Sequence, residues 1–458
     1  MKNKITILAL NICMLITSLE SVEAANILLL DNPNIHYDGA FYTQVTPTLV
    51  TFNRHKPEVY NNTESGIYGS WINQWVITQT GVRIRFKTSS PTITFTFQKR
   101  TGGGTVGANP TNGFSVFANN TLLANYSTLS FTINNPNAGN SSSYEVSLPN
   151  LWAIDLIGMA LDDTYDLEDT GTLTKPTYIA IGDSKAHGTG QYVSSAKTYP
   201  FQLASLMQWN LYNIAVAGST LGWAIALNVK GVPSVDFITV ELGYNDFYYL
   251  SENLAAKQNQ YERLIDSLRF YQPLAKIFCI TPITTTTSSG AAPYSLDQYR
   301  NMVQTVVSSR MQTDPNIFVI PGPSYSNATM LASGDPVHLS ESGALTLANN
   351  LAVPINDPSS IVLITTSNED AQESTKKKID IYYLSNSKLN LNVEQTGYYV
   401  VEIYDTNGKS FCKSYQTYLN SGGNEINFAC NGLKIGTTCI VRIQKEKFIE
   451  SKFMYVSE

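Results

Sequence analysis

The residues Gly182-Asp183-Ser184 follow directly on a mostly apolar run, residues 178–181, near the middle of the chain. A buried strand that ends in a tight turn has this pattern, and it places the serine at the carboxyl end of the strand. A serine hydroxyl in that position can attack a carbonyl carbon if a neighbouring base accepts its proton. The competing interpretation is that Ser184 only caps the next helix, so the catalytic one requires partners elsewhere in the chain.

Gly218 and Asn245 have the residue types that could assist such an attack. Each follows a later apolar segment, and Asn245 stands within Gly243-Tyr244-Asn245-Asp246. The attack builds negative charge on the carbonyl oxygen, which fixed N–H donors stabilise. We therefore expect three donors, namely the backbone N–H groups of Ser184 and Gly218 and the side-chain amide of Asn245.

His338 is the predicted base among the four histidines of the chain. Asp335 precedes it by three residues, so its carboxylate can turn back to one ring nitrogen and leave the other for Ser184. His187 is the rival base, but it stands too close to Ser184 in sequence for good geometry, and we expect it to shape the entrance. We expect Asp183 to hold the backbone of the turn.

These residues meet only if a parallel sheet brings them together. From 173 to 356, strand-like runs alternate with helix-like runs, which predicts a three-layer α/β domain with all strand ends on one edge. Residues 25–172 alternate polar and apolar types in short runs and predict a jelly-roll-like β-sandwich. The polar stretch 357–378 predicts a linker, and 379–458 a small C-terminal β-sandwich.

Length, charge and the N-terminus limit location and partners. The 458 residues require several domains, and the net charge of −6 argues against a nucleic-acid partner. Lys2 and Lys4, an apolar core and a small-residue cleavage site predict a secretory signal at 1–24, so we expect an exported protein. No other stretch predicts a membrane span.

Cysteine usage suggests a C-terminal disulfide and no metal site. Cys412, Cys430 and Cys439 allow three pairings, and Cys279, in an apolar run, predicts a buried free thiol. The Cys and His positions form no zinc pattern.

The four polar segments together resemble the SGNH, or GDSL-type, hydrolase family. The matching segments, in the family's order, are Gly182-Asp183-Ser184, Gly218, Gly243-Tyr244-Asn245-Asp246 and Asp335-Pro336-Val337-His338. The resemblance implies a flavodoxin-like fold with Ser184 as nucleophile, Gly218 and Asn245 as oxyanion donors, His338 as base and Asp335 as its orienting acid. It implies no metal or organic cofactor. Lys185 departs from the usual Leu, Ser or Ile, and we expect it to change only the charge at the rim of the site.

The order of domains resembles exported carbohydrate esterases such as the family 2 acetylxylan esterases. This implies a serine esterase that removes acetyl groups from an acylated carbohydrate. Four aromatic residues follow the oxyanion segments, namely Trp223, Tyr244, Phe247 and Tyr248. They can stack on sugar rings or simply pack beneath the loops. The alternatives are a lipid esterase or thioesterase, and a non-catalytic glycan-binding protein on a hydrolase scaffold.

The last eighty residues resemble the C-terminal sorting domain of the type IX secretion system of Bacteroidetes-type bacteria. The segments that carry this resemblance are 398–409, Gly432-Leu433-Lys434 and 448–456, whereas Gly436-Thr437-Thr438-Cys439 replaces the usual Gly-x-Tyr. The resemblance implies the secretion machinery as a partner and a secreted or cell-surface protein that crosses the periplasm. The alternative is a carbohydrate-binding or spacer module.

Overall fold

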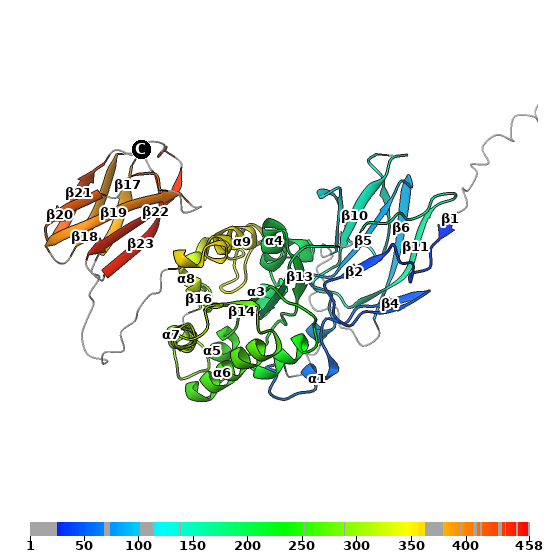
Figure 1. The fold of residues 1–458 in the computed structure, drawn as a ribbon, viewed down its shortest axis with the longest axis horizontal. Helices are drawn as coiled ribbons and strands as arrows, with labels where there is room; N and C mark the ends of the chain where they lie inside the picture. Colours follow the sequence, from blue (N-terminus) through cyan, green and yellow to red (C-terminus); the bar gives the residue numbers. More distant parts are fainter. Residues whose placement is uncertain are drawn as a thin grey trace, which may run out of the picture. The chain divides into compact units, whose positions relative to one another are not determined.

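The structure is a computed structural model, drawn as a ribbon in Figure 1. The contacts within the chain divide it into two compact units. The first contains residues up to Arg54 with 77–174 and 193–195, and the second contains 55–76, 175–192 and the chain from 196 onward. The described residues are 25–67, 74–100, 113–361 and 379–456, without 138, 172, 192, 251, 288, 386, 394–395, 406–409, 413–414, 429–432, 436 and 446–447. The predicted signal segment and most of the predicted linker lie outside them.

A parallel sheet forms the centre of the second unit. Its strands are β12 (Thr177–Gly182), β13 (Asn210–Asn213), β14 (Phe237–Glu241), β15 (Lys276–Ile280) and β16 (Ile317–Ile320). They lie in the order β13-β12-β14-β15-β16, the flavodoxin-like arrangement, in which the strand order reverses between β12 and β14. Open α/β sheets bind ligands at that point. Ser184 follows β12 and Asn245 follows β14, so the topology brings both residues there.

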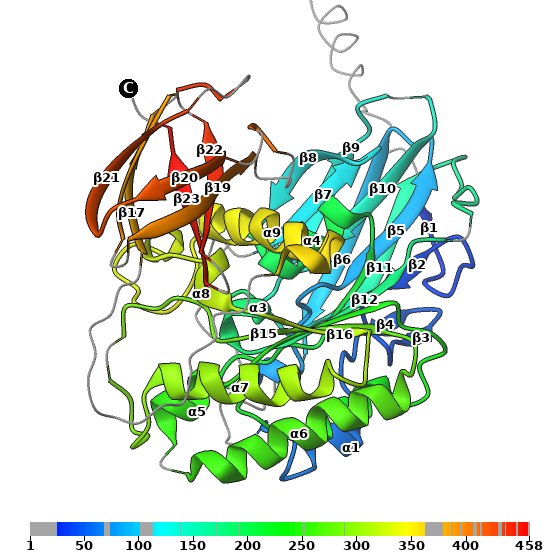
Figure 2. The ribbon, with the colours of Figure 1, turned by 60° about the vertical axis from the view of Figure 1, so that its left-hand side comes forward.

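Helices cover both faces of this sheet, with α6 and α7 on one side and α4 and α9 on the other (Figure 2). The α-helices whose bounds lie within the described residues are α1 (Pro57–Tyr60), α3 (Ser184–His187), α4 (Tyr199–Met207), α5 (Tyr244–Tyr249), α6 (Leu254–Tyr271), α7 (Leu296–Arg310), α8 (Gly322–Tyr325) and α9 (Glu341–Asn356). Side-chain caps begin three of the long helices, at Asn253, Ser295 and Ser340. The prediction of alternating strands and helices in this part of the chain is confirmed.

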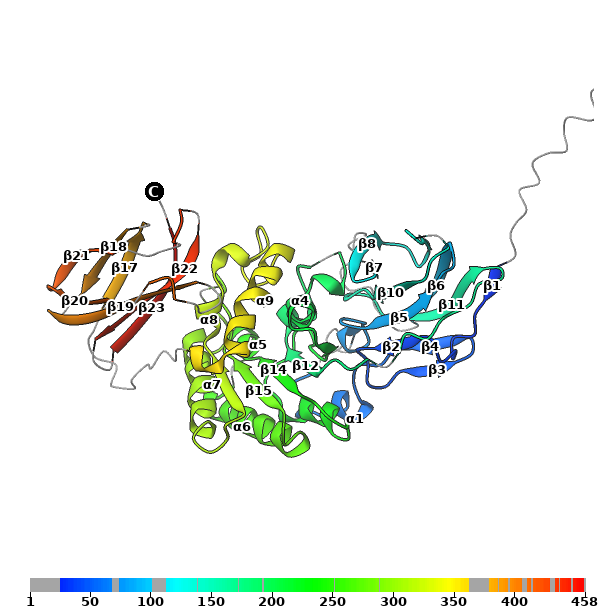
Figure 3. The same cartoon turned by 45° about the horizontal axis from the view of Figure 1, so that its top comes forward.

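Two antiparallel sheets make up the first unit (Figure 3). One contains β3 (Gln44–Thr46), β4 (Leu49–Thr51), β11 (Ile154–Asp162), β6 (Thr92–Lys99) and β9 (Ser130–Asn134) in this order, with β1 (Ala25–Ile27) also paired to β11. The other contains β2 (His36–Asp38), β5 (Arg83–Thr88), β10 (Ser142–Ser147), β7 (Phe114–Ala118) and β8 (Thr121–Tyr126). Side chains of both sheets share one core, where the ring of Phe86 lies 5.6 Å from that of Phe95. The jelly-roll topology stays a prediction.

Residues 55–76 group with the second unit, although the sequence pattern places them inside the β-rich segment. The N–H of Thr220 donates to the oxygen of Gly66 at 2.9 Å, and that of Ala224 donates to the oxygen of Glu64 at 3.1 Å. Gly66 has a φ of +72°, and a Cβ there would lie 2.1 Å from the Thr220 oxygen, so the approach requires glycine. Contacts between segments so far apart in sequence leave no local pattern that would have revealed this grouping.

The described residues from 379 onward form two small antiparallel sheets around one core. The first sheet has the order β17 (Ile379–Leu384), β18 (Lys388–Val393), β21 (Gly422–Asn427), and the second β20 (Tyr415–Leu419), β19 (Gly397–Asp405), β22 (Thr438–Lys445), β23 (Phe448–Tyr455). Cys412 is disulfide-bonded, whereas Cys439 and Cys279 are buried free thiols. Within the described part of the chain, no helix is long and apolar enough to cross a bilayer.

Candidate active site

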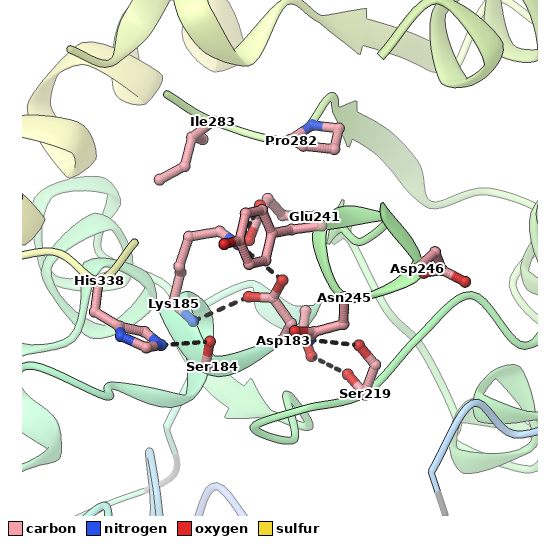
Figure 4. Close-up of polar contacts among 12 residues, drawn as sticks. Asp183, Ser184, Lys185, Ser219, Glu241, Asn245, Asp246, Pro282, Ile283 and His338 are labelled. Atoms are coloured by element: carbon pink, nitrogen blue, oxygen red, sulfur yellow. Dashed lines mark hydrogen bonds and ion pairs between the residues drawn. The ribbon is translucent and has the colours of Figure 1, made fainter. Parts of the chain in front are cut away.

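Ser184, His338 and Asp335 form one chain of hydrogen bonds. Nε2 of His338 lies 3.0 Å from Oγ of Ser184 (Figure 4), and its Nδ1 lies 2.8 Å from Oδ2 of Asp335. A neutral imidazole with its proton on Nδ1 donates to the carboxylate and can accept the serine proton on Nε2. The structure thus brings together the three residues that the sequence singled out for this chemistry, from segments 154 positions apart.

The turn after β12 presents the hydroxyl of Ser184. Asp183 caps the four-residue helix α3, and its Oδ1 accepts the backbone N–H of Lys185 at 3.0 Å. Gly188, with a φ of +109°, ends the helix. A Cβ at Gly182 would lie 2.6 Å from the Cβ of Ala186, so glycine permits the sharp change from strand to helix. Asp183 therefore supports the turn, as expected from the sequence.

The loop before α9 holds the carboxylate of Asp335 in place. Its Oδ1 accepts the backbone N–H groups of Val337 at 2.8 Å and His338 at 2.9 Å. Partial burial acts to raise the pKa of Asp335, but these two hydrogen bonds and that from the His338 ring outweigh it and lower the pKa. The carboxylate therefore stays ionised beside the imidazole, where it can stabilise an imidazolium if His338 accepts a proton.

Gly218 and Asn245 lie on two neighbouring segments that are joined by hydrogen bonds. Gly218 has a φ of +80°, and among the described residues its N–H has no acceptor. The side-chain amide of Asn245 donates to the oxygen of Ser219 at 2.8 Å, which leaves its second hydrogen available. The hydroxyl of Ser219 in turn donates to the oxygen of Gly182 at 3.1 Å, at the end of β12 and two residues before Ser184. Both predicted donors are therefore linked to the segment that carries Ser184.

Asp246 also joins the segment of Gly218 to the segment of Asn245. It is fully buried, its Oδ2 accepts the backbone N–H of Leu221 at 2.9 Å, and its Oδ1 lies 3.2 Å from Nζ of Lys257. Burial raises the pKa of Asp246 to about 6, although the lysine and the backbone N–H oppose the change. No local signal distinguished Asp246 from an ordinary surface carboxylate.

His187 is buried next to the Gly218 segment, so the expectation that it shapes the entrance of the site is wrong. Its ring is fully buried and packs edge-on against Trp75, with 5.2 Å between the ring centroids. Its Nδ1 accepts the backbone N–H of Ala217 at 2.9 Å, next to Gly218. His187 therefore helps to fix the course of that segment.

The four predicted sugar-stacking residues differ in exposure. Tyr244 and Phe247 are each 3% exposed, so neither can offer a ring face to a ligand. The indole N–H of Trp223 donates to Oε2 of Glu64 at 2.7 Å, and Arg263 lies over its ring. Tyr248 is 38% exposed, and its ring stacks on that of Tyr244 with 5.8 Å between the centroids. Tyr248 is thus the most exposed of the four residues.

Lys185 does not contribute charge to the rim of the site, because it is fully buried. Its Nζ lies 2.8 Å from Oδ2 of Asp183 and 3.4 Å from Oε1 of Glu241 (Figure 4). Glu241 is the last residue of the buried strand β14. A glutamate at the end of so apolar a run is the sequence feature that could have indicated a buried charged partner for Lys185.

The sequence comparison supplies a family for the region that contains the site. Residues 180–344 match the GDSL-like Lipase/Acylhydrolase family. The chain contains a GDSL-type hydrolase domain. No functionally curated protein matches this chain in sequence.

Several solved structures share the fold of a large part of this chain. A salicylyl-acyltransferase, SsfX3, from a tetracycline biosynthetic pathway has a TM-score of 0.61 at 18% identity, covering 71% of this chain and 94% of that one. A putative GDSL-like lipase from Bacteroides ovatus has a TM-score of 0.53 at 12% identity, with coverages of 70% and 98%. A family two carbohydrate esterase from Clostridium thermocellum, solved with cellohexaose, has a TM-score of 0.50 at 18% identity, with coverages of 62% and 94%.

The described residues of the GDSL domain contain no cluster of metal ligands. Among the described residues, no group of three or more His, Cys, Asp or Glu side chains could hold a metal ion. The polar groups around Ser184 are instead those that activate a hydroxyl and stabilise an oxyanion.

Proposed function

We propose that the protein is an exported serine esterase that removes acetyl groups from an acylated carbohydrate. The observation that carries the proposal is the 3.0 Å contact between Nε2 of His338 and Oγ of Ser184, with Asp335 bound to the other ring nitrogen. A serine hydroxyl is a weak nucleophile by itself, and this contact provides the base that it needs.

In the proposed reaction, Oγ of Ser184 attacks the ester carbonyl while Nε2 of His338 takes its proton. The oxyanion receives hydrogen bonds from the N–H groups of Ser184 and Gly218 and from the amide of Asn245. The C–O bond of the ester breaks, and His338 returns its proton to the departing alcohol. Water, deprotonated by the same imidazole, then attacks the acyl-serine and releases the acid and free Ser184.

A carbohydrate substrate is supported by the resemblance in domain order and by the fold shared with the carbohydrate esterase from Clostridium thermocellum. Tyr248, exposed and close in sequence to Asn245, is an aromatic side chain that a sugar can reach. Export is supported by the predicted signal segment 1–24, and a role for the secretion machinery by the resemblance of the C-terminal residues to a sorting domain.

Replacing Ser184 by Ala tests the assignment of the nucleophile. We expect the variant to lose hydrolysis of 4-nitrophenyl acetate while its thermal unfolding and far-UV circular dichroism stay those of the wild type. Ser342→Ala, which alters an exposed hydroxyl on α9, is the matched control and should keep full activity. Turnover retained by folded Ser184→Ala would contradict the proposal.

A series of 4-nitrophenyl esters from acetate to octanoate tests the acyl group. A deacetylase is fastest on acetate, whereas rates that rise with chain length would indicate the alternative of a lipid esterase. Release of acetate from acetylated xylan, measured beside deacetylated xylan, tests the carbohydrate class directly.

A further inference from the structure

Lys185 stands immediately after the nucleophile and is buried at the reversal point of the sheet. Its side chain extends from the turn after β12 toward the end of β14 (Figure 4). Gly182 and Glu241 are neighbours in the register of these two strands, so one lysine spans both strand ends. A lysine is almost never fully buried without ionic partners, so its contacts account for its presence there.

The groups around the ammonium come from both segments. Asp183, at 2.8 Å, belongs to the nucleophile turn. Glu241, at 3.4 Å, and the ring of Tyr244, whose centroid lies 4.6 Å from Nζ, belong to the segment that leads into α5. Asn245 is the next residue after Tyr244. The lysine therefore contacts Asp183 on the segment that carries Ser184, and both Glu241 and Tyr244 on the segment that leads to Asn245.

The charges in this cluster depend on one another. Burial and the neighbouring Asp183 raise the pKa of Glu241, and Lys185 counteracts that change. The ammonium keeps its own pKa above the usual value because its two acidic neighbours outweigh the effect of burial. Without the lysine, two carboxyl groups would face each other in an apolar interior, and one of them would bind a proton or move away.

We propose that Lys185 is a positioning residue that sets the place of Asn245 relative to Ser184. It holds Asp183, which supports the turn, and at the same time Glu241 and Tyr244, which precede Asn245. The role rests on the proposed function, because it concerns stabilisation of the oxyanion formed by the attack of Ser184. Displacements of about 1 Å at such a donor are enough to lower a rate substantially.

Lys185→Met, which preserves the length of the side chain, tests this role. We expect kcat on 4-nitrophenyl acetate to fall about tenfold or more with a KM within about threefold, because the lost contact acts on the transition state. We expect the rate at which a fluorophosphonate labels Ser184 to fall in parallel. In an Asn245→Ala background the same substitution should cost about threefold at most, since the donor that it positions is already gone.

Arg269→Met is the matched control for a loss of stability. Arg269 binds Asp314 and the oxygens of Gln272 and Ala275 at the opposite edge of the same sheet. We expect it to lower the melting temperature without changing kcat. If Lys185→Met does not fold, Glu241→Gln removes only the tie to β14 and keeps the Lys185–Asp183 pair, and it should show the same non-additivity with Asn245→Ala.

The outcomes separate the two proposals. Losses from Lys185→Met and Asn245→Ala that multiply, or a kcat unchanged in folded Lys185→Met or Glu241→Gln, would overturn the positioning role alone. A wild-type protein whose Ser184 neither turns over the ester nor reacts with the fluorophosphonate would overturn the proposed function, and the positioning role with it.

Discussion

The side-chain amide of Asn245 donates a hydrogen bond to the main-chain oxygen of Ser219 at 2.8 Å. This contact determines which end of the amide faces the segment of Gly218, because only the nitrogen can donate to a carbonyl oxygen. It therefore orients the second N–H of Asn245, which remains available to donate to another group. An oxyanion donor that is oriented before the reaction needs no reorganisation when charge develops.

Replacing Asn245 by Ala should lower kcat by about 10²- to 10³-fold and change KM little, because the amide acts on the oxyanion of the transition state. Steady-state kinetics with 4-nitrophenyl acetate measure both constants. Asn245→Asp is the sharper comparison, since it keeps the shape of the side chain but cannot donate to Ser219. A kcat for Asn245→Asp equal to that of the wild type would argue against a donor role.

Asp335→Asn should keep the loop before α9 and lose catalysis. The amide oxygen can still accept the N–H groups of Val337 and His338, but the amide nitrogen would favour the wrong tautomer of the imidazole. We expect kcat/KM to fall by about 10²- to 10⁴-fold with a melting temperature close to that of the wild type. A fall of less than about tenfold in the folded variant would mean that Asp335 does not orient His338.

The buried carboxyl of Asp246 should make stability depend on pH. Its pKa is about 6 in the folded protein and near 3.8 in the unfolded chain, so folding favours the protonated form. Its favourable contribution is complete below about pH 3.8 and is lost as the pH rises through about 6. Asp246→Asn lacks this dependence and keeps an acceptor for the N–H of Leu221.

Thermal unfolding of both proteins from pH 4 to pH 8 measures the effect. We expect the melting temperature of the wild type to fall relative to that of Asp246→Asn as the pH rises through about 6. A difference between the two proteins that does not change with pH, or that changes in the opposite direction, would contradict the raised pKa.

Glu64 should influence catalysis through the backbone that it holds. Its carboxylate accepts the indole N–H of Trp223 and pairs with Arg263, and its main-chain oxygen accepts the N–H of Ala224. We expect Glu64→Ala to lower kcat by about three- to tenfold, because the segment of Gly218 lies directly before these contacts. Loss of the contacts should also cost about 1 kcal/mol of stability.

Glu262→Ala, on α6, is the control for Glu64→Ala, since the side chain of Glu262 is hydrogen-bonded to Gln258 one turn away on the same helix. Equal kinetics of the two variants would show that Glu64 serves stability alone.

Several features of the site were predictable because they depend on neighbours in sequence. The strand before Gly182, the cap by Asp183 and the approach of Asp335 to His338 each span a few residues, and residue type and spacing carry that information. The convergence of Ser184, Gly218 and Asn245 followed from the rule that parallel strands end on one edge. The polar–apolar alternation noted for 25–172 is likewise found in β6, where Ile93, Phe95 and Phe97 are buried.

Other features depend on which surface covers a residue, and a pattern along the chain does not contain that information. A lysine next to a catalytic serine has the same sequence neighbours whether it lies at the rim of a site or inside the protein. Lys185 is buried because Glu241 and Tyr244, from the neighbouring strand β14 and the residues after it, contact its ammonium group. The burial of Tyr244 and Phe247 likewise depends on which distant segments pack over them.

The sequence by itself determined the chemistry available to this protein, through the types and order of Ser184, Gly218, Asn245, Asp335 and His338. Only the tertiary structure decided what supports that chemistry: Glu64 and Gly66 beside the Gly218 segment, His187 packed next to it, and Lys185 between two strand ends. Types and spacings are local properties of a chain, whereas burial and long-range hydrogen bonds exist only after distant segments have packed together.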